Sequence, residues 1–310
     1  IFDGLADIYR KTRRREGDLI GLQVSRLYLS RLDRALNEMS RADKFPRLKD
    51  FFRGFWLGNR RFDSIETYQS LLYQHRDQLR PPCLMLMHGD CHGRNVMLDV
   101  CYEKIKLIDL DKLDPYGDYV MDLALLIEDV ALFRRLFDAN YRYYLRPEQV
   151  QLASDGTRID YPPFLSEAGI LFQQLLLAQA DNLARELGDT HYRARLWLAI
   201  ALYLLRLVEK QDDLRLGTVL YVEAIKLLDT LVQYLEGRQP LPPMPILRPL
   251  IGLDKVEIVA LARRIGTFDI STRAQERCAF LPDNPVTRGS LDRLREILSH
   301  LPSPEADRDA

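Results

Sequence analysis

The hydrophobic pattern of the chain changes its period in the middle of the sequence. Residues 84–87, 96–98 and 104–108 are short apolar or alternating runs, whereas apolar side chains recur at three- and four-residue steps before Arg80 and after Val120. A period of two is typical of strands and a period near 3.6 of helices. The pattern therefore predicts a mostly helical α+β protein in which short strands interrupt the helices.

The helical stretches are long and carry clear apolar stripes. Residues 1–80 are expected to be helical without a strand, and one helix is expected to begin at Asp63, with Glu66 completing a capping box. Further helices are predicted for residues 163–187, 192–209 and 216–235. Such stripes predict a helical bundle.

The bundle is expected to end where prolines accumulate. Gly237 and the proline-rich residues 240–249 favour a boundary near residue 238, which gives a first domain of residues 1–238 and a small α/β tail of residues 239–310. The chain begins with Ile1 and not with Met, and we therefore expect it to be a fragment of a longer protein.

The composition narrows the class of protein. The 44 Lys and Arg residues nearly balance the 45 Asp and Glu residues, so the charge does not predict a nucleic acid or a membrane surface as partner. No apolar run has the length of a membrane span. The four cysteines form no CxxC pair, which favours free thiols and a cytoplasmic location.

Residues 88–95, with the sequence HGDCHGRN, contain the residue types that phosphoryl transfer needs. Such transfer requires a carboxylate that orients the attacking hydroxyl and oxygen ligands that hold Mg²⁺ on the phosphates. Asp90 can supply the carboxylate. Asn95, five residues later, and Asp109, after the next strand, can supply the oxygen ligands if a turn at residues 99–103 joins the two strands into a hairpin.

HGDCHGRN followed by LIDLD at residues 107–111 resembles the catalytic loop and metal motif of the aminoglycoside phosphotransferase and choline kinase superfamily, which is related to protein kinases. The resemblance implies the carboxy-terminal lobe of a kinase-like fold, a helical bundle with a short catalytic-loop β-hairpin. It also implies ATP and Mg²⁺ as cofactors and a small-molecule hydroxyl as acceptor. Asp90 would be the catalytic base, Asn95 and Asp109 would bind Mg²⁺, and His88 would be a structural residue of the loop.

Two further residues match this superfamily. Asp122, in Asp122-Leu123-Ala124, corresponds to an Asp that begins the next helix and supports the catalytic loop, and Arg94 corresponds to an arginine that could meet the transferring phosphate. His92 is either a contact of the site or a packed residue. Asp111 is expected to be a solvated loop carboxylate, although it could assist a metal.

The amino-terminal lobe that grips ATP in this superfamily is expected to be absent. Residues 1–80 show no glycine-containing strand-turn-strand and no strand lysine for the phosphates, so we expect little ATP turnover from this segment alone. A pseudokinase or binding module is therefore an alternative to an active phosphotransferase. The acceptor is expected to contact residues 125–205.

The tail carries a second resemblance. The run from Leu247 to Lys255, continued by residues 265–267, Cys278 and residues 284–287, is similar to the end of the adenylating domain of tRNA 4-thiouridine synthetase. The resemblance implies that Lys255 takes part in activation and that Cys278 relays sulfur. A helix start at Lys255 and a packed thiol at Cys278 are the alternative interpretations. A tRNA-thiolation component, with tRNA as a partner through the tail, thus remains a further hypothesis.

Overall fold

The computed structural model divides into two compact units, residues 1–252 and residues 253–310. The model describes residues 2–15, 17–41, 48–98, 105–129, 145–153, 157–162, 167–208 and 210–239. All described residues belong to the first unit. The predictions for Lys255 and Cys278 lie outside them, as does the predicted turn at residues 99–103.

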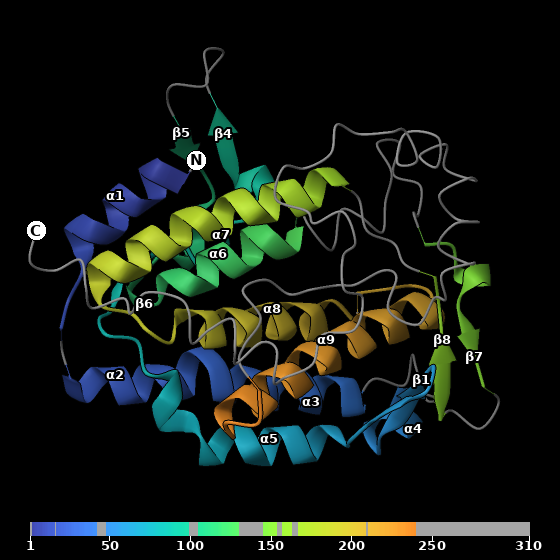
Figure 1. Cartoon of the computed structure of the whole chain (residues 1–310). Coiled ribbons are helices and arrows are strands. Elements are labelled where there is room, and N and C mark those ends of the chain that lie inside the picture. Colours follow the sequence, from blue (N-terminus) through green and yellow to red (C-terminus); the bar gives the residue numbers. More distant parts are fainter. Residues whose placement is uncertain are drawn as a thin grey trace, which may run out of the picture. The chain divides into compact units, whose positions relative to one another are not determined.

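Helices dominate the part of the chain that the structure describes (Figure 1). In chain order they are α1 (Phe2–Thr12), α2 (Gly17–Val24), α3 (Ser30–Arg41), α4 (Leu48–Phe52), α5 (Ile65–Gln74), α6 (Tyr119–Ile127), α7 (Glu167–Leu187), α8 (Tyr192–Val208) and α9 (Leu214–Leu235). The three long helices predicted after residue 160 are confirmed with small shifts of their ends.

Helix α8 is the centre of the bundle. It is apolar on nearly every side and almost completely buried, from Tyr192 to Val208, which is the pattern of a helix surrounded by protein. It packs against α9, α6 and α3, and Figure 1 shows it between α6 on one side and α9 on the other. The core therefore fixes α6 and α8 relative to each other. Residues at the ends of these two helices line the cavity that is described below.

The strands are short and form three small sheets within the described residues. They are β1 (Phe55–Leu57), β2 (Arg60–Phe62), β3 (Met85–Met87), β4 (Val96–Leu98), β5 (Ile105–Leu107), β6 (Asp114–Gly117), β7 (Gln151–Leu152) and β8 (Arg158–Asp160). β3 pairs with β6 and β4 with β5, both antiparallel, and the third sheet has the order β2-β1-β8-β7 with β1 parallel to β8. The predicted mostly helical α+β class and the strands β3, β4 and β5 are confirmed.

The expectation that residues 1–80 lack a strand is wrong. β1 and β2 form an antiparallel hairpin, and Gly58 adopts a φ of 56° in its turn. The rings of Phe55 and Phe62 are buried and stacked 5.2 Å apart. Each of these strands has only three residues, so its alternation of apolar and polar residues is hidden by the helical period around it. The hairpin is extended by pairing of β1 with β8, which is about a hundred residues away in the sequence and cannot be foreseen from local spacing.

The predicted cap of α5 is also wrong by one residue. Ser64, not Asp63, is the N-cap, and its hydroxyl accepts a hydrogen bond from the backbone N–H of Thr67 at 3.2 Å. Both side chains are good caps, so local chemistry alone does not distinguish them.

The acidic stretch after Asp109 is partly structured. Asp114 begins β6, and Asp118 is completely buried and caps α6 by accepting from the N–H of Val120. Asp111 is exposed, as predicted. No helix among the described residues is long and apolar enough to cross a membrane.

Candidate active site

The hairpin formed by β4 and β5 brings two of the predicted metal ligands to one end. Its register pairs Val96 with Leu107, and the N–H of Ile108 donates to the carbonyl oxygen of Asn95 at 3.0 Å. Asn95 therefore lies beside the residue that precedes Asp109.

Helix α6 holds the loop of residues 88–95 through two carboxylates. Asp122 accepts from the backbone N–H groups of His88 at 2.8 Å and Gly89 at 2.9 Å. Asp129, two residues beyond the end of α6, accepts from the N–H of Gly93 at 2.8 Å. The hydroxyl of Tyr9 on α1 also donates to Asp122 at 3.0 Å. Burial raises the pKa of Asp122 to about 6, although these hydrogen bonds favour its ionised form.

His88 connects the loop to the strand before Asp109. Its side chain is buried, its Nε2 lies 3.0 Å from the carbonyl oxygen of Ile108, and its Nδ1 lies 3.3 Å from the N–H of Asp90. One neutral tautomer serves both contacts, because Nε2 donates to the carbonyl and Nδ1 accepts from the amide. The imidazole faces the backbone, in line with a structural role.

Asp90 forms an ion pair with Lys112 through its Oδ2. Burial acts to raise the pKa of Asp90, but the hydrogen bond and the charge of Lys112 outweigh it and keep this pKa below its ordinary value. Gly89 makes the contact possible: it has a φ of 80°, and a Cβ there would collide with the carbonyl oxygen of Lys112. The carboxylate of Asp90 is therefore ionised at neutral pH and can accept a hydrogen bond from a hydroxyl.

The donor set at Asn95 and Asp109 suits Mg²⁺ that is also bound by phosphates. The amide nitrogen of Asn95 donates to the carbonyl oxygen of Asp90 at 3.0 Å, so its amide oxygen is the atom that could ligate a metal. Asp109 is exposed, and its backbone has a φ of 60°. All other non-glycine residues of the described part have a negative φ. Positive φ is uncommon for a residue other than glycine, and such residues cluster at functional sites. The described residues contain no cluster of three or more His, Cys, Asp or Glu that could hold a metal alone.

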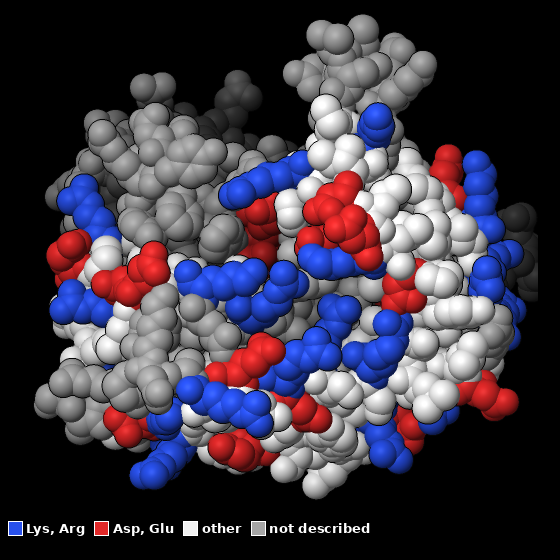
Figure 2. Space-filling model, turned by 180° about the vertical axis from the view of Figure 1, so that it is seen from behind, with Lys and Arg blue, Asp and Glu red and all other residues white. Residues whose placement is uncertain are grey.

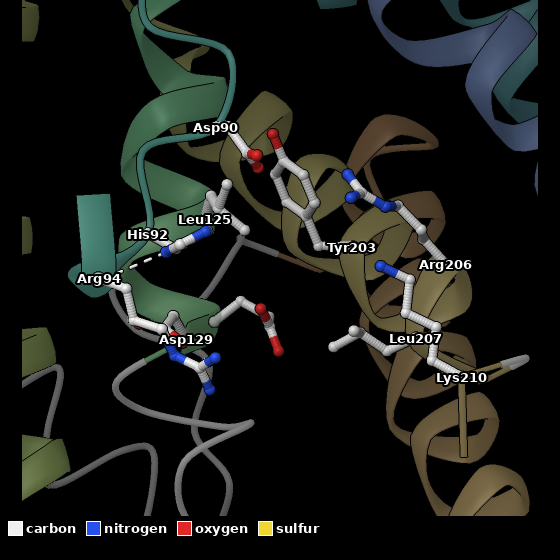
Figure 3. Close-up of a pocket in the computed structure, with 10 residues that line it drawn as sticks. Asp90, His92, Arg94, Leu125, Asp129, Tyr203, Arg206, Leu207 and Lys210 are labelled. Atoms are coloured by element: carbon white, nitrogen blue, oxygen red, sulfur yellow. Dashed lines mark hydrogen bonds between the residues drawn. The ribbon is translucent and has the colours of Figure 1, made fainter. Parts of the chain in front are cut away.

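A cavity of about 390 Å³ opens beside Asp90. Figure 3 shows that its walls come from the loop of residues 88–95, from the end of α6 and from the end of α8. Its lining residues are Asp90, His92, Arg94, Leu125, Glu128, Asp129, Tyr203, Arg206, Leu207 and Lys210. The volume suits a small molecule.

Two buried polar atoms in this cavity have no hydrogen-bond partner among the described residues, Oε1 of Glu128 and the hydroxyl of Tyr203. Arg31 acts on the pKa of Tyr203, but it does not lie in hydrogen-bonding geometry with this hydroxyl. Burial, followed by the charge of Asp129, raises the pKa of Glu128 to about 8. Glu128 is therefore a neutral acid at pH 7 and can donate a hydrogen bond into the cavity.

The pKa of Glu128 predicts how stability depends on pH. An acid with a raised pKa in the folded state keeps a proton that the unfolded chain releases, so it costs stability as pH rises from about 4.5 to about 8. Because one pKa unit corresponds to about 1.4 kcal/mol, wild type should lose at least ~1.4 kcal/mol relative to Glu128→Gln over this range. Urea unfolding of both proteins at pH 5 and pH 8 measures the difference. A constant difference would contradict the assignment.

Several residues of the site were not predicted from the sequence: Tyr9, Lys112, Glu128, Asp129, Tyr203, Arg206 and Lys210. The spacing Leu125, Glu128, Asp129 places polar groups on one turn of an otherwise apolar helix, which is the only local signal. Arg94 lines the cavity and is exposed. His92 lines the cavity too, and it accepts from the N–H of Arg94 at 3.3 Å.

Cys91 is a buried thiol in the same loop. Burial raises its pKa above the ordinary value, so it stays protonated and is not a nucleophile.

Comparisons with known proteins identify two families along the chain. Residues 2–154 match the phosphotransferase enzyme family, and residues 237–301 match the thiamine biosynthesis protein (ThiI) family. The resemblance to the phosphotransferase family and the resemblance of the tail are therefore both confirmed over these residues.

Several curated tRNA sulfurtransferases match a short part of the chain, its tail. A probable tRNA sulfurtransferase of Thermococcus kodakarensis is 54% identical over 54 residues, which is 17% of this chain and 14% of the relative. One of Natranaerobius thermophilus is 55% identical over 60 residues, 19% of this chain and 14% of the relative. One of Thermus thermophilus is 48% identical over 64 residues, 20% of this chain and 16% of the relative. The chain thus spans about a seventh of the length of these relatives. No solved structure matches it significantly.

Proposed function

We propose that this chain carries the catalytic part of a phosphotransferase that moves the γ-phosphate of ATP to a hydroxyl of a small molecule. The observation that carries the proposal is the position of Asp90, whose ionised carboxylate lines a cavity of about 390 Å³ next to the hairpin of Asn95 and Asp109. The match of residues 2–154 to the phosphotransferase family supports it.

In this mechanism Asp90 receives the acceptor. Its carboxylate accepts a hydrogen bond from the attacking hydroxyl, orients the oxygen and takes the proton as the bond to the γ-phosphorus forms, while the bond from this phosphorus to the bridging oxygen breaks and ADP leaves. Lys112 exchanges its contact with Asp90 for the hydroxyl or for a phosphate oxygen. Asn95 and Asp109 would hold Mg²⁺, which supplies charge neutralisation on the phosphates.

The loop must be rigid for this geometry to persist. Asp122 and Asp129 bind three backbone N–H groups of the loop, and His88 connects the loop to Ile108. We assign these residues to positioning, since their side chains bind backbone groups of the loop.

The proposal is tested by transfer of labelled γ-phosphate from ATP to a panel of small hydroxyl compounds, with the complete chain. Label in an acceptor, lost on addition of EDTA and restored by Mg²⁺, is the expected result, at a low rate because residues 1–80 show no glycine-containing loop or strand lysine for the phosphates of ATP. Binding of ATP without any transfer would favour the alternative of a pseudokinase or binding module.

A second candidate function comes from the tail. We propose that residues 239–310 serve tRNA thiolation, because residues 237–301 match the ThiI family and tRNA sulfurtransferases are about half identical to them. Retention of tRNA by the complete chain, and at least a tenfold weaker retention without residues 240–310, is the expected result in a pull-down. Equal retention by both proteins would remove this function.

A further inference from the structure

Each carboxyl group of the cavity either has a partner within the protein or carries no charge. Asp90 pairs with Lys112, Asp129 accepts from the N–H of Gly93, and Glu128 is a neutral acid at pH 7. None of them requires a cationic ligand at neutral pH.

The positively charged side chains that line the cavity, in contrast, have no carboxylate paired with them among the described residues. Within the part of the chain that the structure describes, Arg94, Arg206 and Lys210 form no ion pair, and all three are exposed toward solvent. Arg206 lies in the last turn of α8 and Lys210 lies two residues beyond the end of this helix, and both line the same cavity as Asp90 (Figure 3). Lys and Arg side chains also gather across the middle of the face seen in Figure 2.

Crowding of positive charge affects Lys210 directly. Partial burial lowers its pKa and the charge of Arg206 lowers it further, while the charge of Asp90 opposes this shift only in part. An anion placed between Arg206 and Lys210 would remove this repulsion and form charge-assisted hydrogen bonds with both.

The unpartnered oxygen of Glu128 is an independent indication of a ligand. Glu128 is only 3% exposed. A side-chain oxygen that is buried this far rarely lacks a hydrogen bond, because no protein group then replaces the water it has lost. A neutral carboxyl donates a hydrogen bond to an oxygen of a ligand, and it does not repel an anion.

We propose that Arg206 and Lys210 form an anion subsite, and that the acceptor carries a carboxylate or phosphate group in addition to its reactive hydroxyl. This inference rests on the proposed phosphotransferase function. The anion binds at the end of α8, and the hydroxyl points to Asp90. The same chemistry could be offered by the phosphates of the nucleotide, and the experiment distinguishes the two sources.

The first measurement does not need catalysis. Inorganic phosphate is titrated into the complete chain and its dissociation constant is measured by calorimetry, for wild type, for Arg206→Gln combined with Lys210→Gln, and for Lys49→Gln. Lys49 is an exposed lysine on α4 outside the cavity and serves as the matched control. The double variant should bind at least tenfold more weakly, and the control should bind like wild type. Equal binding by all three proteins would overturn the subsite.

Competition then identifies the source of the anion. Glycerate, a small hydroxy acid, should displace phosphate, whereas glycerol at the same concentration should not. Displacement by Mg²⁺-ATP, and not by glycerate, would assign the subsite to the nucleotide and overturn the acceptor assignment.

Transfer separates this inference from the proposed function. Labelled phosphate should appear in hydroxyl compounds that carry an anionic group more than in their neutral or cationic counterparts, and the double variant should reduce this preference. Transfer to neutral or cationic compounds that is insensitive to the double variant would overturn the inference and leave the phosphotransferase function standing. Phosphate binding that depends on Arg206 and Lys210, with no transfer to any compound, would contradict the function instead.

Discussion

Replacing Asp90 with Asn should reduce phosphoryl transfer by about 10²- to 10⁴-fold, the usual contribution of a general base. Asn keeps the size of the side chain and can accept a hydrogen bond, but it cannot take the proton of the hydroxyl. The fold should remain, because the ion pair lost with Lys112 is half exposed on the lysine side, and such pairs contribute about 1 kcal/mol or less. Transfer of labelled phosphate and urea unfolding together measure both effects.

The matched control is Asp50→Asn, the same chemical change at an exposed position of α4 outside the cavity. It should transfer phosphate like wild type. Equal activity of Asp90→Asn and Asp50→Asn would remove the assignment of the base. A collapse of stability in Asp90→Asn would mean that the residue holds the loop together.

The helices and the β4–β5 hairpin could be predicted because they depend on the spacing of apolar residues that are close in the sequence. The period of apolar residues defines α7, α8 and α9, and the alternation at residues 104–108 defines β5. The hairpin follows, because two strands separated by a short connection pair with each other. Asn95 and Asp109 could therefore be assigned to one end of that hairpin from the sequence.

The rest depends on contacts between residues that are far apart in the chain. Tyr9 meets Asp122 across 113 positions, and Lys112 meets Asp90 across 22. No periodicity links such residues, since the packing of helices around α8 decides which side chains meet. The expected acceptor region, residues 125–205, includes Leu125, Glu128, Asp129 and Tyr203 of the cavity, but Arg206, Leu207 and Lys210 lie just beyond it.

Burial is the other property that the sequence conceals. Asp118 stands in an acidic stretch that suggests a solvated loop, yet it is completely buried. Its partner is Arg195 of α8, which donates from Nε at 2.6 Å and also binds Asp189 with its two other nitrogens, at 2.5 Å and 3.1 Å. Tyr28 and Tyr119 complete the network by donating to the two carboxylates at 2.8 Å and 3.0 Å. Since Asp118 caps α6, this network supports the helix that holds the loop of residues 88–95.

Arg195→Leu should therefore destabilise the protein by about 3–5 kcal/mol, because it leaves the carboxylates of Asp118 and Asp189 buried without a counterion. The control is Arg193→Leu on the same helix, whose ion pair with Asp181 is about a third exposed on both sides and should be worth at most ~1 kcal/mol. Urea unfolding at neutral pH measures both variants. Neutralising the two partners as well, with Asp118→Asn and Asp189→Asn, should recover part of the loss, since the cost lies in the unpaired charges and not in the missing guanidinium. If Arg195→Leu were no less stable than Arg193→Leu, the buried charges would not be what holds α6 against α8.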